Sequence, residues 1–209
     1  MASVKHRIGP ADHGRRMTLD EFREADEEPG HRYELARGVL EVTEIPSDEH
    51  GQIVDNIHEA FSLFRPRHPG LIRRIGHGSD IRFIIPDLGS DRHPDLAIVF
   101  RDPPRDCRGR QLATLAVEVV SPGGKARRRD LVSKREDYLA VGLLEYWIVD
   151  PELRQVTVLL RRGEGANAAW EERIRQGDDL VPSELLPGFP GRVSEFWAGV
   201  EGAAAANGE

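Results

Sequence analysis

The chain has 209 residues, of which 39% are hydrophobic and 31% are charged, which is typical of an ordinary globular protein with one sizeable core. Its formal net charge of −7 argues against a protein that binds nucleic acid over its whole surface. The single cysteine excludes an internal disulfide, and no apolar run approaches the ~18 residues of a membrane span. The start of the sequence has no secretion signal, so we expect a cytoplasmic protein.

The N-terminal part is expected to contain a flexible segment, a short helix and a hairpin. Residues 1–16 are predominantly polar and are predicted to be flexible, ahead of a single domain over residues 17–200. Thr18 and Glu21 have the spacing of a capping box, which predicts a helix from there to about residue 27, before Pro29-Gly30. Residues 32–36 and 39–42 flank Arg37-Gly38 and predict a β-hairpin.

A long helix and four strands are expected next. Ser47 is a helix cap, and apolar side chains at helical spacing continue from it as far as Phe64. Pro66 and Pro69-Gly70 end this helix. The strand-like segments that follow are residues 71–75, 80–85, 95–100 and 112–120.

The C-terminal part predicts a further helix and more strands. A helix over residues 127–140 is ended by Gly142, and a hairpin joins residues 144–149 to 155–160. A short strand over residues 170–174 follows, then aromatic side chains that dock on the core (Phe189, Phe196 and Trp197) and a flexible tail over 201–209. We therefore predict an α/β fold. Its central mixed sheet is built from the segments around Asp80, Asp95, Glu118 and Leu144, and the helices that begin near Ser47 and Arg127 flank it.

Two acidic residues lie at or within apolar strands. Asp95 precedes Leu96–Phe100, and Glu118 is the single charge within the run 115–120. A buried carboxylate is costly unless it is paired or binds a metal, and two on neighbouring strands would repel each other. A shared divalent cation would remove this repulsion, and carboxylate oxygens suit Mg²⁺ or Mn²⁺. For Asp95 the alternative is a turn residue at the strand entry.

Other common sites are absent from the sequence. The Gly123-Gly124-Lys125 segment lacks the spacing of a phosphate-binding loop, and the histidines lack zinc-site spacing. What remains is a series of motifs in one order. It comprises Tyr33-Glu34-Leu35 with Gly38, His50, Pro94-Asp95, Val117-Glu118-Val119-Val120-Ser121-Pro122, Asp130 with Lys134 and Tyr138, Gly142, and Glu145-Tyr146-Trp147-Ile148-Val149-Asp150-Pro151. Over roughly residues 17–196 this series resembles the Uma-type family of restriction endonucleases, within the PD-(D/E)xK superfamily.

The resemblance implies a restriction-endonuclease-like fold and metal-dependent hydrolysis of DNA phosphodiester bonds. It implies that Asp95, Glu118 and Glu34 bind Mg²⁺ or Mn²⁺, and that Lys134 acts with them in catalysis. The superfamily pattern places its lysine two residues after Glu118, where this chain has Val120. By family analogy alone, a homodimer is also expected. A nuclease-like fold without catalysis, which serves as a nucleic-acid-binding or protein-interaction module, is the alternative.

Helical geometry independently supports an inward-pointing lysine. Leu131, Lys134, Tyr138 and Val141 share one helix face, which should be directed at the core. The alternative for Lys134 is an exposed pair with Asp130. Glu34 could equally be an ordinary exposed strand residue. His50 could be a partly buried histidine with no role in the site. We expect His50 and Tyr138 to have at most accessory roles in the site.

Basic residues are concentrated in two segments, at Arg65–Arg74 and after Glu118. The second includes Lys125, Arg127, Arg128 and Arg129, which we predict to hold DNA phosphates beside the cleavage site. The alternative is a solvated surface with scattered salt bridges.

Overall fold

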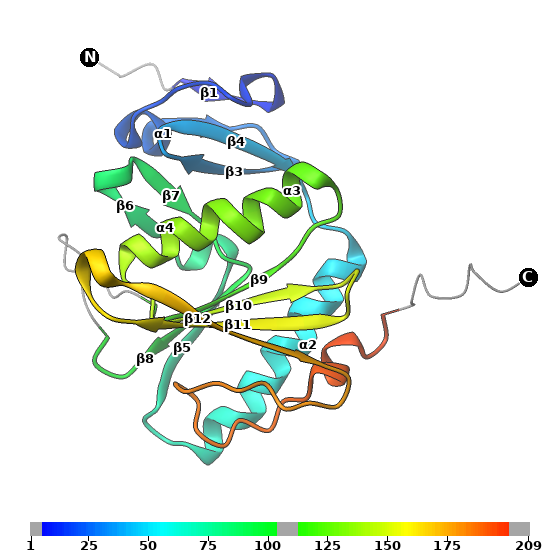
Figure 1. Cartoon of the computed structure of the whole chain (residues 1–209). Coiled ribbons are helices and arrows are strands. Elements are labelled where there is room, and N and C mark those ends of the chain that lie inside the picture. Colours follow the sequence, from blue (N-terminus) through cyan, green and yellow to red (C-terminus); the bar gives the residue numbers. More distant parts are fainter. Residues whose placement is uncertain (1–5, 104–112, 201–209) are drawn as a thin grey trace, which may run out of the picture.

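The computed structural model describes residues 6–103 and 113–200, and its main feature is a six-stranded mixed sheet (Figure 1). The strand order is β12-β11-β10-β9-β8-β5, and β9 and β10 are parallel whereas the other neighbours are antiparallel. The strands are β5 (Ile72–His77), β8 (Leu96–Phe100), β9 (Leu115–Val119), β10 (Glu145–Asp150), β11 (Gln155–Arg162) and β12 (Ala169–Gln176). The predicted α/β class and the mixed sheet are confirmed.

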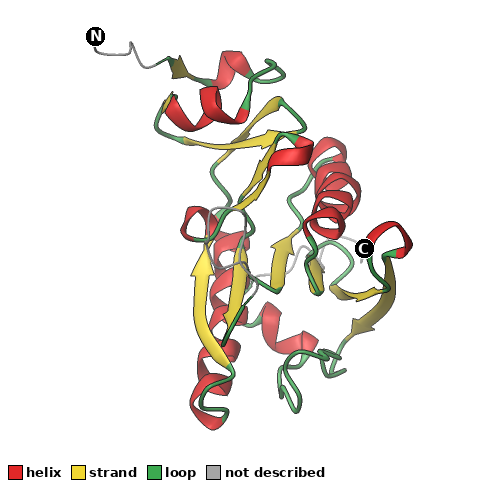
Figure 2. Ribbon diagram, turned by 90° about the vertical axis from the view of Figure 1, so that its left-hand side faces the viewer, coloured by secondary structure: helices red, strands yellow, loops and turns green. Residues whose placement is uncertain are grey.

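Helices cover both faces of this sheet (Figures 1 and 2). The apolar stripe of α2 (Asp48–Phe64) packs on one face, in a cluster with alternate side chains of β9 such as Val117. On the other face lie α3 (Gly124–Arg128), a π-helical turn (Arg129–Ser133) and α4 (Lys134–Val141). Because side chains of a strand alternate between faces, Glu118 lies on the face covered by α4. The π-helical turn was not predicted, and such turns are frequent at functional sites.

A second sheet of four strands has the order β4-β3-β7-β6. It contains β3 (His31–Ala36), β4 (Val39–Glu44), β6 (Phe83–Ile85) and β7 (Ser90–Arg92). The predicted hairpin forms β3 and β4, with Arg37 and Gly38 at φ of 50° and 75°, as its two-residue turn requires. The segment near Asp80, expected in the central sheet, belongs here through β6. The reason is that β6 pairs with β7, a short polar strand. Because β7 has no apolar pattern, the sequence analysis did not predict it.

The N-terminal residues are more ordered than the sequence suggested over 6–16. Strand β1 (Arg7–Ile8) pairs with β2 (Asp26–Glu27), and Ile8 is fully buried in a cluster with Phe22 and Leu40. The predicted capping box of Thr18 is present in α1 (Leu19–Glu24), which ends earlier than expected because β2 pairs with β1. Short 3₁₀ segments cover Pro10–Asp12, Arg65–Arg67, Gly78–Asp80, Pro86–Leu88, Gly165–Asn167 and Val193–Trp197.

The C-terminal aromatic residues dock as predicted. Phe189, Phe196 and Trp197 are buried in the cluster beneath α2.

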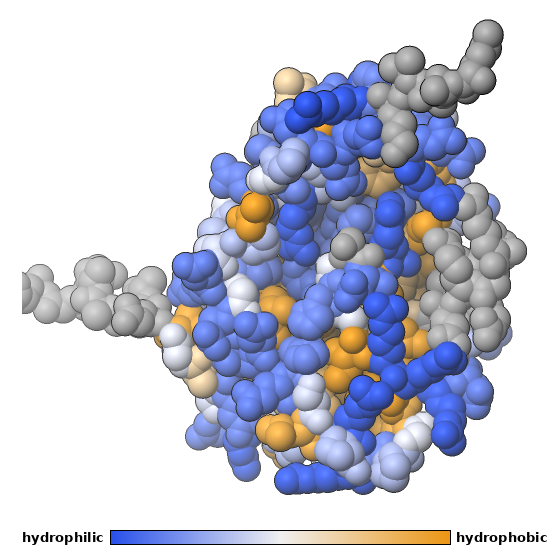
Figure 3. Space-filling model, turned by 180° about the vertical axis from the view of Figure 1, so that it is seen from behind, coloured by the Kyte–Doolittle hydropathy of each residue, from blue (hydrophilic) through white to orange (hydrophobic). Residues whose placement is uncertain are grey.

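Seen from behind, most of the surface is hydrophilic, and apolar groups appear mainly in the lower half, where the six-stranded sheet lies (Figure 3). Within 6–103 and 113–200, no helix has the length and apolar character needed to cross a bilayer. The division into one domain and a flexible tail stays a prediction.

Candidate active site

Lys134 is buried between two carboxylates. Its Nζ lies 2.9 Å from Glu118 Oε1 and 3.0 Å from Glu34 Oε1, and the residue is only 3% exposed. Tyr138, one turn later on α4, donates a hydrogen bond of 2.6 Å to the same Glu118 oxygen. Burial, and then the charge of Glu118, raises the pKa of the Tyr138 hydroxyl well above its usual value, so it remains a donor. The predicted inward lysine is confirmed, and the side chain of Asp130 lies outside the described residues.

Asp95 is held at the start of β8 by three groups. Its Oδ2 accepts a hydrogen bond of 2.9 Å from the Val119 backbone N–H and lies 3.2 Å from His50 Nε2. Its Oδ1 accepts a hydrogen bond of 2.9 Å from Arg32. Burial alone would raise the pKa of this carboxyl, but His50 and then Arg32 lower it well below its usual range. Asp95 is therefore ionised and links β8, β9, β3 and α2.

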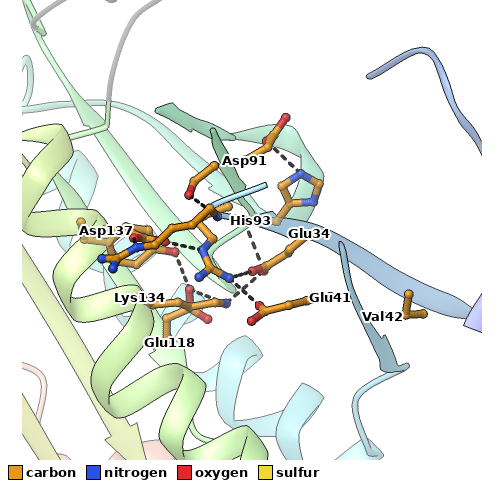
Figure 4. Close-up of polar contacts among 12 residues, drawn as sticks. Glu34, Glu41, Val42, Asp91, His93, Glu118, Lys134 and Asp137 are labelled. Atoms are coloured by element: carbon orange, nitrogen blue, oxygen red, sulfur yellow. Dashed lines mark hydrogen bonds and ion pairs between the residues drawn. The ribbon is translucent and has the colours of Figure 1, made fainter. Parts of the chain in front are cut away.

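Glu34 points from β3 toward Lys134 and is one of the labelled residues in Figure 4. Its other carboxylate oxygen accepts a hydrogen bond of 3.2 Å from Arg92, and the His93 backbone N–H is 3.3 Å from Oε1. Burial favours the neutral acid, but the positive charges of Lys134 and Arg92 lower the pKa of Glu34 to about 2. The sequence left open whether Glu34 is an exposed strand residue, and the structure shows its side chain to be mostly buried.

Arg92 connects the second sheet to α4, a role that the sequence analysis missed. Its guanidinium is fully buried and donates to Asp137 at 2.8 Å, to Glu41 at 2.5 Å and to Glu34. Burial opposes its charge, yet the three carboxylates raise the pKa of Arg92 above its ordinary value. The only sequence signal was an arginine two residues before Pro94-Asp95, which by itself predicts nothing.

A cavity of about 20 Å³, which is the size of one water molecule or one ion, lies among the site residues. Carboxylates of Glu34, Glu41, Asp95 and Glu118 face it, together with the cations of Arg32, Arg129 and Lys134. The lining supplies hard oxygen donors, the ligand chemistry that Mg²⁺ and Mn²⁺ prefer, and Val119 also belongs to it. In the described part of the chain, no group of three or more acidic, histidine or cysteine side chains is already arranged around an ion position.

Two open grooves adjoin the cavity, and both include Arg32 and His50 in their walls. The first, of about 540 Å³, contains four histidines and is called here the histidine groove: His31, His50, His77 and His93. The second, of about 560 Å³, is lined by residues 42–47 and is called the loop groove. The cavity is therefore located where two grooves meet.

The predicted phosphate-binding arginines have different environments. Arg127 makes a forked pair with Asp150, at 3.1 and 2.6 Å, and another with Glu152 at 3.0 Å. Arg128 is exposed, whereas Arg129 lines the cavity and the loop groove. The side chain of Lys125 lies outside the described residues. Arg127 is thus engaged by acidic groups at the β10–β11 turn, which the sequence did not reveal.

Comparisons with known proteins identify a family and a shared fold. A family model described as Uma2, a putative restriction endonuclease, matches residues 19–194. No curated protein matches the chain. Among solved structures, it is similar to a putative nuclease belonging to DUF820 from Anabaena variabilis ATCC 29413, with a TM-score of 0.66 and 19% identity. The likeness covers 87% of this chain and 97% of the other, and at this identity it shows the shared fold.

Proposed function

The chain belongs to the Uma2 family of putative restriction endonucleases, and from this premise we propose that it is a Mg²⁺- or Mn²⁺-dependent endonuclease that hydrolyses DNA phosphodiester bonds. The observation that carries the proposal is the buried Lys134 in direct contact with Glu118 and Glu34, on a cavity that Asp95 also lines. An ordinary core has no reason to enclose three carboxylates and a lysine around a space of this size.

In this proposal Asp95, Glu118 and Glu34 would hold the divalent ion, and the Val119 carbonyl would assist them. Such an ion would polarise the scissile phosphate and lower the pKa of bound water. Tyr138 fixes the orientation of Glu118 through its hydrogen bond of 2.6 Å. Lys134 positions the attacking water or neutralises charge that develops on the phosphate.

Entry of the ion requires the internal ion pairs to rearrange. Each carboxylate on the cavity already has a cation at 2.5 to 3.0 Å: Lys134 for Glu34 and Glu118, Arg92 for Glu41, and Arg32 for Asp95. This same observation favours the second candidate, a nuclease-like module that binds nucleic acid or protein without cleavage. The homodimer expected from family analogy also stays a proposal.

Cleavage of supercoiled plasmid tests the proposal. The protein is incubated with plasmid in Mg²⁺, in Mn²⁺ and in EDTA, and nicked and linear products are measured. We expect products only with metal, and none from Glu118→Gln. The matched control is Glu136→Gln, which removes an exposed carboxylate from the helix that carries Lys134 and should cut normally. Plasmid binding without cleavage in any metal would instead support the binding module.

A further inference from the structure

Arg32 stands where the cavity and both grooves meet. It comes from β3, two residues before Glu34, and it lines all three spaces. Its side chain is 33% exposed, while that of its partner Asp95 is 6% exposed. One end of this ion pair is therefore accessible from the grooves and the other is buried at the candidate metal position.

The guanidinium of Arg32 is held at one point. Among the described residues, Asp95 is its hydrogen-bond partner: the Nη1–H group of Arg32 donates to Asp95 Oδ1 at 2.9 Å. Arg92 differs, because its buried guanidinium contacts Glu34, Glu41 and Asp137 and ties three elements together. An arginine has five N–H donors, so Arg32 has most of its hydrogen-bonding capacity available on the groove side.

We propose that Arg32 is an exchangeable counter-cation of the metal site. Without a divalent ion it neutralises Asp95, and when the ion binds Asp95 the guanidinium is released into the grooves, where it holds a phosphate of the substrate. This inference rests on the proposed function. A buried carboxylate needs a positive partner, and a divalent ion at Asp95 supplies one, so the arginine and the ion compete for the same charge.

The groove side suits a phosphate group. Guanidinium presents paired donors that match phosphate oxygens, and it keeps its charge at every working pH. The long side chain of Arg32 can turn from Asp95 toward either groove without movement of β3. The exchange also keeps the charge balanced, since the released cation meets the incoming negative charge of the polymer beside the bound ion.

Arg82 provides a matched control. It pairs with Asp91 through a hydrogen bond of 3.0 Å from Nε, its side chain is 32% exposed and its partner is fully buried. It lines the histidine groove, as Arg32 does, but its partner Asp91 is outside the lining of the cavity. Removal of Arg82 therefore deletes an equivalent ion pair that should not compete with the metal.

Mn²⁺ titration calorimetry tests the competition. Arg32→Gln should bind Mn²⁺ about tenfold more tightly than wild type, whereas Arg32→Lys, which keeps the charge, and Arg82→Gln should bind like wild type. Equal or weaker affinity in Arg32→Gln would overturn the inference, as would equal tightening in Arg32→Lys. Absence of Mn²⁺ binding by wild type would refute the metal site of the proposed function itself, and the inference with it.

Thermal melting covers the case of an unstable variant. Mn²⁺ should raise the Tm of Arg32→Gln by more than it raises that of wild type, because the ion replaces the missing cation. Equal increases would contradict the exchange.

Phosphate binding is tested with a DNA duplex in Mn²⁺ by fluorescence anisotropy, in a Lys134→Met background that slows cleavage. Arg32→Gln should lower the salt dependence of binding by about one unit of log–log slope. An unchanged slope would show that Arg32 does not hold a phosphate.

Discussion

The replacement Lys134→Met is the sharpest perturbation of the candidate site. Methionine keeps the unbranched stem and the helix propensity but removes the charge that lies 2.9 Å from Glu118 and 3.0 Å from Glu34. Removing one partner of a buried ion pair typically costs about 3–5 kcal/mol. We therefore expect a folded protein with clearly reduced stability.

The pKa of Glu34 gives the pH range over which this cost should appear. Burial raises this pKa, whereas the cations lower it to about 2, with Lys134 making the largest contribution and Arg92, His93 and Arg129 following. A lowered folded-state pKa stabilises the protein above the unfolded-state pKa, and this stability is lost as pH falls. The difference in unfolding free energy between wild type and Lys134→Met should thus be full at pH 7 and shrink between about pH 4.5 and pH 2.

Urea unfolding at several pH values measures this difference, and plasmid cleavage measures the activity. We expect a loss of about 3 kcal/mol at pH 7 and a fall in cleavage on the order of 10² or more. Arg135→Met is the control, because Arg135 is on the same helix but forms a part-exposed pair with Glu172. A stability loss at pH 7 no larger than that of the control would refute the buried pairing, and normal cleavage would refute the role of Lys134.

Three further predictions concern the ligands and the basic segment. In Mn²⁺ calorimetry, Asp95→Asn and Glu118→Gln should each bind much more weakly than wild type, and unchanged affinity in both would exclude a shared ion. Arg128→Ala should lower the salt dependence of DNA binding by about one unit of log–log slope. Arg127→Ala should mainly lower the Tm, because the Arg127 side chain pairs with acidic groups. Equal slopes for Arg128→Ala and wild type would mean that Arg128 only faces solvent. Lys125→Met should cut DNA normally, and loss of cleavage in this variant together with normal cleavage in Lys134→Met would assign the catalytic lysine to the Gly-rich segment.

Several structural features follow directly from local sequence. The hairpin at Arg37-Gly38, the long helix after Ser47 and the capping box at Thr18 are each encoded within a few residues. Helical spacing alone predicted that Lys134 faces the core, and the position of Glu118 within an apolar strand predicted that it is buried. Both residues are buried. These predictions succeed because backbone geometry and burial repeat with a short period along the chain.

The charge balance of the site, by contrast, was decided only by the tertiary structure. The sequence suggested a metal as the remedy for repulsion between two acids, whereas the fold already supplies Arg32 to Asp95 from 63 residues away. Arg92 reaches Glu34 across 58 residues and Asp137 across 45, and the polar strand that carries it showed no apolar pattern. An ion pair between distant residues leaves no periodic trace in either segment, because each side chain alone is equally compatible with solvent. Only the packing of the second sheet against α4 excludes that solvent and brings these charged groups into contact.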